Sequence, residues 1–189
     1  MTSIPGKTKY VDEYTGEVLR DDLVREAMID ELSDFSTNVW EAESVDKIKQ
    51  VPDHILVRSR WVMANKGDSS EPDVRARLVG CEVNKGGERV DAFFASTPPL
   101  EAKKFLFSLA ASNKGSSSPR SEYKLLLIDI KRAYMYAPET REVYVDLPEQ
   151  DSEPGMCGLL NKSMYGTRGA AQSWETWYST IFVNELGFK

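Results

Sequence analysis

Three stretches of the chain carry apolar residues three and four positions apart, which is the spacing of one face of an α-helix. The first follows Asp21 and Asp22, either of which can cap a helix, and the second follows Pro98-Pro99. We interpret the three faces as packing surface, although the aromatic third face could also stack on nucleic-acid bases. The faces are Val24, Ala27, Met28, Leu32 and Phe35; Ala102, Phe105, Leu106, Leu109 and Ala110; and Trp174, Trp177, Tyr178, Ile181 and Phe182.

Other segments have the patterns of β-strands. Residues 55–64 and 74–83 are predicted to form two strands, because the loop between them is rich in turn-forming residues. Residues 123–130 predict a buried strand, because this run is apolar almost throughout rather than alternating. Residues 143–147 alternate apolar with more polar side chains, which is typical of a half-buried strand.

Composition changes this picture only in part. With 189 residues, of which 41% are hydrophobic, the chain is long enough to bury a core. The two cysteines lack metal-ligand spacing, so a reducing compartment is expected. No apolar run is long enough to span a bilayer and no signal-peptide core is visible, so we predict an intracellular protein, cytoplasmic or nuclear, without a membrane partner.

The net charge of −6 argues against a nucleic-acid partner, but its distribution does not. Residues 47–132 have a net charge of +6, whereas residues 1–46 and 133–189 are both acidic. A local basic excess can bind phosphates even in an acidic chain. The alternative is a solvated charged face without a ligand, which the charge pattern alone favours.

Arginines on a predicted strand give the basic excess a possible function. Arg75 and Arg77 alternate with Ala76 and Leu78, so both guanidinium groups should project from one face of the strand. Arginine suits polyphosphate because its planar fork donates two hydrogen bonds to one phosphate group. Two exposed strand arginines without a ligand are the alternative. Lys131 and Arg132 could also contact a nucleic-acid backbone, although we expect their side chains to be solvated.

Asp129 is the residue to which the sequence most clearly gives a possible chemical role. It closes the apolar run 125–128 and precedes Tyr134 by five residues. A carboxylate at the end of a buried strand is fixed in position and partly desolvated, which suits it to hold a divalent metal ion. An aspartate that merely caps the next turn is the alternative.

The motifs, taken in order, resemble the reverse transcriptase domain of copia-type (Ty1/copia) retrotransposons. Each motif is short, but their common order makes chance agreement improbable. The resemblance runs roughly from Leu23 to Lys189 through Glu26-Ala27-Met28 with Glu31, Trp40-Glu41, Arg60-Trp61-Val62, Arg75-Ala76-Arg77-Leu78-Val79-Gly80, Phe94-Ala95-Ser96-Thr97-Pro98, Ile128-Asp129-Ile130-Lys131-Arg132-Ala133-Tyr134, Glu142-Val143-Tyr144-Val145-Asp146-Leu147-Pro148 and Lys162-Ser163-Met164-Tyr165-Gly166.

The resemblance implies an α+β fold, a partial polymerase fingers-and-palm with an antiparallel sheet and packed helices. The expected organisation is a flexible N-terminal arm over residues 1–20, a helical lead-in over 21–50, and a partial reverse transcriptase domain over 51–189. It also implies RNA-directed DNA synthesis, in which a primer 3′-hydroxyl attacks a deoxynucleoside triphosphate with two Mg²⁺ ions bound. Primer–template RNA or DNA and the remainder of a retrotransposon polyprotein are the expected partners.

Residue roles follow from the same resemblance. Asp129 is the expected catalytic residue and metal ligand, with the Ile130 carbonyl as a second ligand. Arg75 and Arg77 would grip the triphosphate, and Tyr134 would exclude a 2′-hydroxyl from the sugar site. Tyr165 and Gly166 would lie against the nucleotide or template. The residues with an expected role are therefore Asp129, Ile130, Arg75, Arg77, Tyr134, Tyr165 and Gly166.

The chain departs from the family pattern in two respects. It lacks the aromatic-x-Asp-Asp motif, since its one Asp-Asp pair is Asp21-Asp22, far upstream. Residues 167–171 also differ from the family's usual Leu-Lys-Gln-Ala-Pro. Two-metal catalysis needs several carboxylates, so we expect the chain to be inactive alone. A non-catalytic nucleic-acid-binding remnant and a protein-interaction remnant stay open as alternatives.

Overall fold

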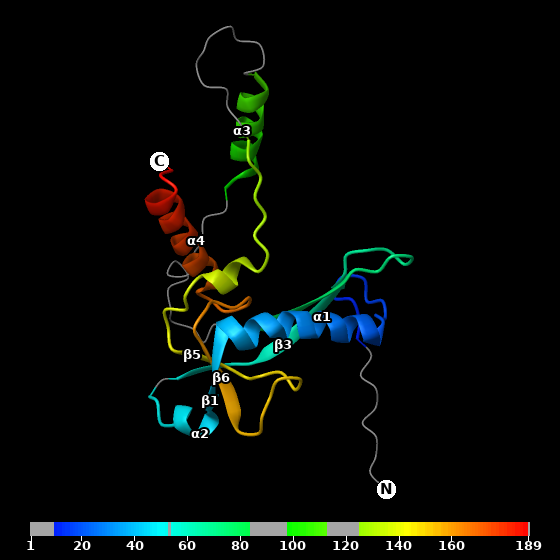
Figure 1. The fold of residues 1–189 in the computed structure, drawn as a ribbon, viewed down its shortest axis with the longest axis vertical. Coiled ribbons are helices and arrows are strands. Elements are labelled where there is room, and N and C mark those ends of the chain that lie inside the picture. Colours follow the sequence, from blue (N-terminus) through cyan, green and yellow to red (C-terminus); the bar gives the residue numbers. More distant parts are fainter. Residues whose placement is uncertain (1–9, 53, 84–97, 113–124, 189) are drawn as a thin grey trace.

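A four-stranded sheet and a separate two-stranded hairpin form the β-structure of the protein (Figure 1). The computed structural model describes residues 10–52, 54–83, 98–112 and 125–188. The larger sheet has the order β1-β6-β5-β2, with antiparallel neighbours except for the parallel pair β2 and β5. Its strands are β1 Trp40–Ser44, β2 Ile55–Val57, β5 Val143–Val145 and β6 Met156–Leu160, and the hairpin consists of β3 Ser59–Asn65 and β4 Val74–Gly80.

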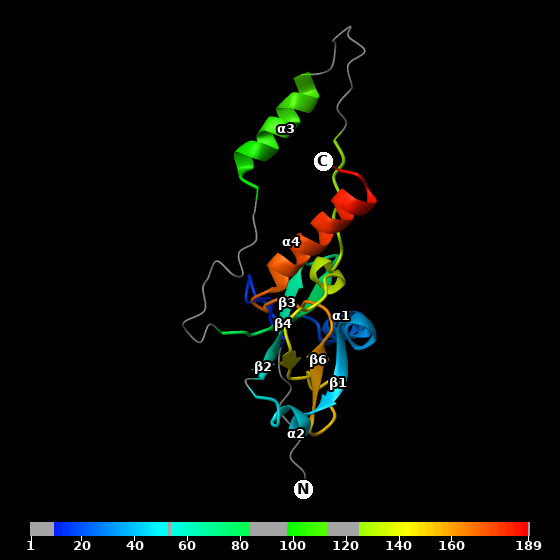
Figure 2. The ribbon, with the colours of Figure 1, turned by 90° about the vertical axis from the view of Figure 1, so that its left-hand side faces the viewer.

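Helices account for most of the remaining regular structure. α1 is continued by a wider π-helical turn and lies across the hairpin, while α4, continued by a similar turn, points away from the larger sheet (Figures 1 and 2). The helical elements are α1 Asp21–Asp34 with η1 Phe35–Val39, α2 Val45–Ile48, α3 Leu100–Ser112, the 3₁₀ turn η3 Ala133–Tyr136, and α4 Ala170–Thr180 with η4 Ile181–Glu185. Within the described ranges no helix combines the length and apolar character needed to cross a membrane. The mixture of helices and mainly antiparallel strands agrees with the expected α+β class.

The apolar stripe of α1 packs as the sequence predicts. Val24 and Met28 are buried against Met63 and Ala76 of the hairpin. The predicted aspartate cap is wrong, because the residue before the helix is Arg20 and no side chain caps it. Asp21 and Asp22 instead lie in the first turn, where negative charge is favourable against the helix dipole.

A single core cluster joins the end of α1, the hairpin, the larger sheet and the η3 turn. Phe35, Leu78 and Met164 are fully buried in it, and Met135 of η3 reaches the same cluster. The packing contacts of such a core fix the relative positions of the elements that enter it, since protein interiors are close-packed. The core therefore holds η3, immediately after the segment of Asp129, against the strand that carries Arg77.

The predicted hairpin is confirmed, although its first strand divides in two. Residues 59–65 pair with 74–80 in antiparallel register, whereas 55–57 pair in parallel with β5 of the other sheet. The break falls at Arg58, so one continuous sequence pattern contributes to two sheets. The second strand ends at Gly80 rather than at residue 83.

A strand is present at residues 143–145, as predicted, but it is fully buried rather than half-buried. β5 pairs with a neighbour on each side, and all three of its residues are buried. Val143 and Val145 enter the main core, while Tyr144 packs on the other face against Ile48 and Cys157. The Tyr144 hydroxyl donates to Glu142 Oε1 at 2.6 Å, which satisfies its polar end and allows a nominally polar position to be buried.

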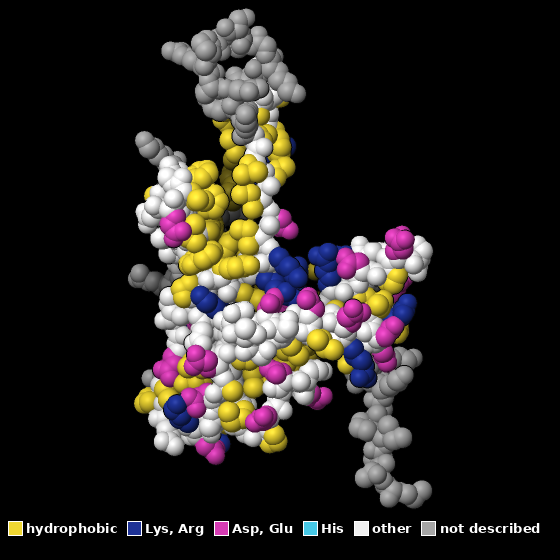
Figure 3. Space-filling view, in the orientation of Figure 1, with side chains coloured by type: hydrophobic (Ala, Val, Ile, Leu, Met, Phe, Trp, Pro, Cys, Tyr) yellow, Lys and Arg dark blue, Asp and Glu magenta, His cyan; other side chains and the backbone are white. Residues whose placement is uncertain are grey.

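The predicted buried strand at residues 123–130 is wrong over its described part. Residues 125–130 have no strand assignment, and Leu126 and Leu127 are 77% and 82% exposed. No described strand lies beside this segment to complete its backbone hydrogen bonds, and a strand without a neighbour is not stable. α3 likewise buries no residue, and Figure 3 shows apolar side chains gathered on the extension that α3 forms.

Residues 10–20 form a turn that is held against the hairpin, and residues 1–9 of the expected flexible arm lie outside the described residues. Val11 and Val18 form an isolated β-bridge across this turn. Asp12 Oδ2 accepts from the Asn65 amide at 2.6 Å, and the Glu13 amide donates to the Met63 carbonyl. These bonds attach the turn to β3.

Candidate nucleotide-binding site

One cleft brings together residues from four distant parts of the sequence. It has a volume of about 640 Å³ and is lined by α1, strand β4 with Asp73, the segment 129–132 and Tyr165. Figure 3 shows basic side chains gathered above α1, between the hairpin and the base of the α3 extension. Five of the seven residues assigned from the sequence line this cleft: Arg75, Arg77, Asp129, Ile130 and Tyr165.

The basic wall of the cleft comes from β4. Arg75 and Arg77 are exposed while Ala76 and Leu78 between and after them are buried, so both guanidinium groups lie on the outer face as predicted. Arg75 forms an ion pair with Asp73 at 3.1 Å, a contact that a bound phosphate would have to replace. Arg77 makes no ion pair among the described residues, and its guanidinium carbon lies 5.7 Å from the centre of the Tyr165 ring.

The acidic element of the cleft is Asp129. Its side chain is exposed, and no described residue forms a hydrogen bond or ion pair with the carboxylate. A metal ion prefers several oxygen ligands, but the described residues contain no cluster of three or more metal-binding side chains. The other carboxylates of the cleft, Asp30, Glu31 and Asp73, are engaged by arginines. These residues therefore do not form a two-metal site.

Tyr134, Tyr165 and Gly166 lie close together, but of the three only Tyr165 lines the cleft. Tyr134 is not among the cleft-lining residues; its ring packs behind Tyr165, with the ring centres 4.8 Å apart. The Gly80 amide donates to the Tyr165 carbonyl at 2.7 Å, which joins this turn to the end of β4. Gly166 has φ +83°, and a Cβ atom there would overlap the Gly80 carbonyl oxygen. Glycine is therefore required at this position by the close approach of two backbones.

A second contact holds the same turn. Glu82 accepts two hydrogen bonds from the Arg141 guanidinium, at 2.8 and 3.2 Å, and one from the Arg168 amide at 2.8 Å. Burial opposes ionisation of Glu82, but these bonds and the charge of Arg141 together lower the pKa of its carboxyl. Glu82 thus connects the residues after β4 to the turn that contains Gly166.

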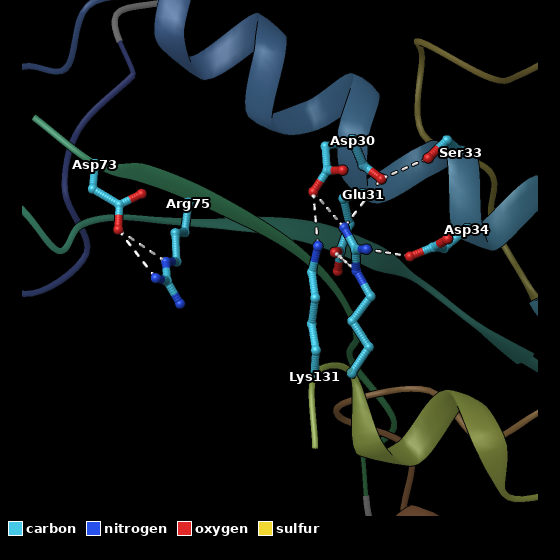
Figure 4. Close-up of polar contacts among 8 residues, drawn as sticks. Asp30, Glu31, Ser33, Asp34, Asp73, Arg75 and Lys131 are labelled. Atoms are coloured by element: carbon cyan, nitrogen blue, oxygen red, sulfur yellow. Dashed lines mark hydrogen bonds and ion pairs between the residues drawn. The ribbon is translucent and has the colours of Figure 1, made fainter. Parts of the chain in front are cut away.

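Arg132 lines the cleft and has an unusual backbone conformation. With φ 55° and ψ 42° it is the one non-glycine residue of the described chain with positive φ. Its side chain is only 14% exposed and forms ion pairs with Asp30 at 2.7 Å, Glu31 at 2.9 Å and Asp34. The expectation of a solvated side chain is wrong for Arg132, because three carboxylates of α1 enclose it. Figure 4 shows these α1 carboxylates, with Lys131 reaching the same helix.

Glu31 connects this arginine to the hairpin. One carboxylate oxygen accepts from Arg132 Nε, and the other accepts from the Leu78 amide of β4 at 3.4 Å. Burial raises the pKa of the Glu31 carboxyl, and the hydrogen bond and charge of Arg132 act in the opposite direction. For Asp30 the balance is reversed: burial again opposes ionisation, but Arg132 and Lys131 lower the pKa of its carboxyl.

Sequence reasoning missed the roles of Glu31 and Arg132. A signal for Glu31 was available, since it occupies a position of the apolar stripe, seven residues after Val24 and four before Phe35. A carboxylate on a buried helix face needs a partner. The sequence did not indicate which basic residue that partner would be, because Arg132 is 101 positions away.

Comparison with known proteins identifies the class of molecule to which these motifs belong. The family described as reverse transcriptase (RNA-dependent DNA polymerase) matches residues 40–189. The chain belongs to this family. It is also 30% identical over 140 residues to the retrovirus-related Pol polyprotein from transposon TNT 1-94 of Nicotiana tabacum, a match that covers 70% of the chain.

This reverse transcriptase sequence is of the copia type, which confirms the resemblance drawn from its motifs. The matched stretch is 10% of the length of the tobacco polyprotein, so the chain spans about a tenth of that relative. No solved structure matches the chain. The assignment of individual elements to polymerase fingers and palm accordingly stays a proposal.

Proposed function

We propose that the chain forms the fingers and the first part of the palm of an RNA-directed DNA polymerase, and that its cleft takes a deoxynucleoside triphosphate. One observation carries this proposal. Asp129 and the pair Arg75 and Arg77 are more than fifty residues apart in sequence, yet they line one cleft. A carboxylate facing two arginines is the arrangement that phosphoryl transfer requires, because phosphates need cationic partners on one side and a metal ligand on the other.

In this proposal the arginines of β4 bind the triphosphate. Arg77 has its guanidinium group beside the Tyr165 ring, and Arg75 exchanges Asp73 for a phosphate oxygen. The exchange is favourable because a phosphate carries more charge than one carboxylate and accepts a forked pair of hydrogen bonds. Tyr165 and Gly166 close the cleft beside the nucleotide or template, and Tyr134 supports Tyr165 and restricts the space near the sugar.

Magnesium is the cation expected for this reaction, and it would neutralise charge on the phosphates when bound. Asp129 and the Ile130 carbonyl can offer two oxygen ligands to one such ion. A two-metal site needs further carboxylates, which the described residues do not bring to the cleft. We therefore propose that this chain does not polymerise by itself and that the remaining ligands come from elsewhere in a longer polyprotein.

Two other functions are compatible with the same fold. The cleft could bind primer–template nucleic acid without catalysis, or the exposed apolar side chains of α3 could contact another protein. Binding to phosphates weakens steeply as salt concentration rises, whereas binding through apolar side chains does not. The salt dependence of nucleic-acid binding therefore separates these alternatives.

Primer extension tests the proposal directly. The 189-residue chain is compared with a chain that continues along the same polyprotein through an aromatic-x-Asp-Asp motif, each with Mg²⁺ or Mn²⁺. We expect extension only by the longer chain, and loss of roughly a thousandfold or more in Asp129→Asn, because metal ligands supply most of the charge stabilisation.

The matched control is Asp46→Asn, which changes an exposed carboxylate paired with Lys49 far from the cleft and should leave extension unchanged. Extension by the 189-residue chain that Asp129→Asn abolishes would show that the proposed inactivity is wrong and the polymerase function right. Extension by the longer chain that survives Asp129→Asn would contradict the role of Asp129.

A further inference from the structure

The two walls of the cleft are joined by one buried side chain. Glu31 of α1 accepts from the backbone of β4 at Leu78, the residue after Arg77. The same carboxylate accepts from Arg132, three residues after Asp129. The Glu31 side chain is 4% exposed and has no room to move away from either partner without leaving a buried group unpaired.

Arg132 is also the residue at which the segment 125–131 meets the η3 turn. Its left-handed conformation is unfavourable for a residue other than glycine. The ion pairs with Asp30, Glu31 and Asp34 help to offset this cost, since hydrogen bonds between charged groups are stronger than those between neutral groups. The position of Asp129 thus depends on contacts with α1.

No strand neighbour holds Asp129 in the described structure. Residues 125–130 are extended and exposed, so the constraints on Asp129 come from the residues that follow it. Met135 is anchored in the main core, and Arg132 is anchored on α1. Both anchors reach β4, Met135 through the core cluster that contains Leu78 and Arg132 through Glu31, and Arg132 is the nearer of the two to Asp129.

We propose that Glu31 and Arg132 are positioning residues that set the separation between Asp129 and the arginines of β4. This inference rests on the proposed function, because it takes the cleft to be the triphosphate site. Neither residue touches the nucleotide in this scheme. Glu31 acts through the Leu78 amide on one wall and through Arg132 on the other.

The charge of Glu31 makes the proposal testable against a simple electrostatic effect. Removing a carboxylate from a cleft that binds an anion should strengthen binding if charge alone matters. Removing a positioning contact should weaken binding. Glu31→Gln therefore gives opposite results under the two explanations.

The experiment measures the affinity of the 189-residue chain for dATP with Mg²⁺, together with the backbone amide signals of the protein by NMR. We expect Glu31→Gln to weaken dATP binding roughly tenfold or more, since displacement by about 1 Å can cost a hundredfold. The amide signals near Arg77 and near Lys131 should both shift. Arg132→Lys, which keeps the charge but loses the planar fork, should weaken binding in the same direction.

Glu13→Gln is the matched control. Glu13 forms an ion pair with Arg60 of the hairpin and does not line the cleft. The control makes the same chemical change and removes the same unit of charge, so dATP binding and the amide signals near Arg77 and Lys131 should be unchanged. If Glu31→Gln impairs folding, Glu31→Asp replaces it, because the shorter side chain keeps the charge but cannot reach both partners.

Two results would overturn the inference. One is Glu31→Gln or Glu31→Asp binding dATP as tightly as Glu13→Gln, and the other is amide shifts confined to one wall of the cleft. If the unaltered chain binds no dATP, the proposed triphosphate site fails. In that case the amide shifts still show whether Glu31 links the two walls of the cleft.

Discussion

Arg77 lies over the ring of Tyr165, with its guanidinium carbon 5.7 Å from the ring centre. This contact links the hairpin to the turn that closes the cleft, and such cation–π contacts contribute about 0.5–1 kcal/mol at exposed sites. It also orients a cation that has no ion-pair partner among the described residues. Arg77 is thus available to a phosphate, which leads to the first prediction.

Replacing both cleft arginines should weaken nucleic-acid binding and change its salt dependence. We expect the 189-residue chain to bind primer–template weakly, and Arg75→Ala with Arg77→Ala to reduce that affinity. The slope of log affinity against log salt should become shallower by roughly one unit or slightly less for each lost phosphate contact. Fluorescence anisotropy of a labelled primer–template at several salt concentrations measures both quantities.

The control for this pair is Arg20→Ala with Lys47→Ala. Both residues make exposed ion pairs, with Asp22 and Glu43, and neither lines the cleft. The control removes two positive charges as well, so a general charge effect would change both double variants equally. Binding that ignores salt, or that both double variants weaken alike, would favour the protein-interaction alternative.

Gly166→Ala should destabilise the fold far more than Gly155→Ala. Both glycines have positive φ, +83° and +80°, so both substitutions incur about 1 kcal/mol of backbone strain. At Gly155 a Cβ atom would meet nothing within 4 Å, whereas at Gly166 it would overlap the Gly80 backbone. We expect a loss of more than about 2 kcal/mol for Gly166→Ala, measured by urea unfolding. Equal losses in the two variants would show that the close approach to Gly80 is not present.

Glu82→Gln should lower stability at neutral pH by about 2–3 kcal/mol, because it removes charge-assisted hydrogen bonds from Arg141 and the Arg168 amide. The pKa of the Glu82 carboxyl is lower in the folded protein than in the unfolded chain. The folded state therefore binds fewer protons, and this stability is present above the unfolded pKa, which is about 4.3, and is lost as pH falls through the folded pKa.

Chemical unfolding at pH 7 and at pH 3 measures this effect. The difference in unfolding free energy between Glu82→Gln and the unaltered protein should narrow at the lower pH, since the unfolded chain then binds the proton more readily than the folded protein does. Asp22→Asn is the control, because its pair with Arg20 is 65% exposed on both sides and should contribute little. If the difference in unfolding free energy between the two proteins is the same at both pH values, ionised Glu82 does not stabilise the fold.

Tyr134→Ala should relax sugar selection in a chain that polymerises. Tyr134 does not line the cleft, but its ring packs against Tyr165, so it would restrict the sugar space by holding the Tyr165 ring in place. We expect the ratio of kcat/KM for dGTP to that for GTP to fall roughly tenfold to a hundredfold. Tyr134→Phe keeps the ring and should leave the ratio unchanged. A ratio that Tyr134→Ala does not alter would place the sugar gate at another residue.

Much of the local structure could be predicted from the sequence. α1, the hairpin and α4 follow from apolar spacing and turn-forming residues within about fifteen positions, since periodicity is a local property. The placement of Arg75 and Arg77 on one face follows from strand geometry in the same way. The order of the motifs identified the family without any three-dimensional information.

Apart from the aspartate cap of α1, the predictions that failed depended on distant neighbours. Residues 125–130 have the composition of a buried strand, but a strand also needs a partner for its backbone, and composition does not supply one. Tyr144 alternates with two valines, but it is buried because Ile48 of α2 and Cys157 of β6 pack against its face of the sheet. The sequence around Arg132 predicts a solvated side chain, but in the folded protein carboxylates of α1 surround it.

The sequence by itself therefore determined the individual helices and hairpin, the family and the kinds of residue available for phosphate and metal chemistry. Only the tertiary structure decided which of these residues share a cleft and which form ion pairs with one another. The physical reason is that burial and ion pairing depend on distance in space. Glu31 and Arg132 are 101 residues apart in the chain, yet their side chains are 2.9 Å apart in the folded protein.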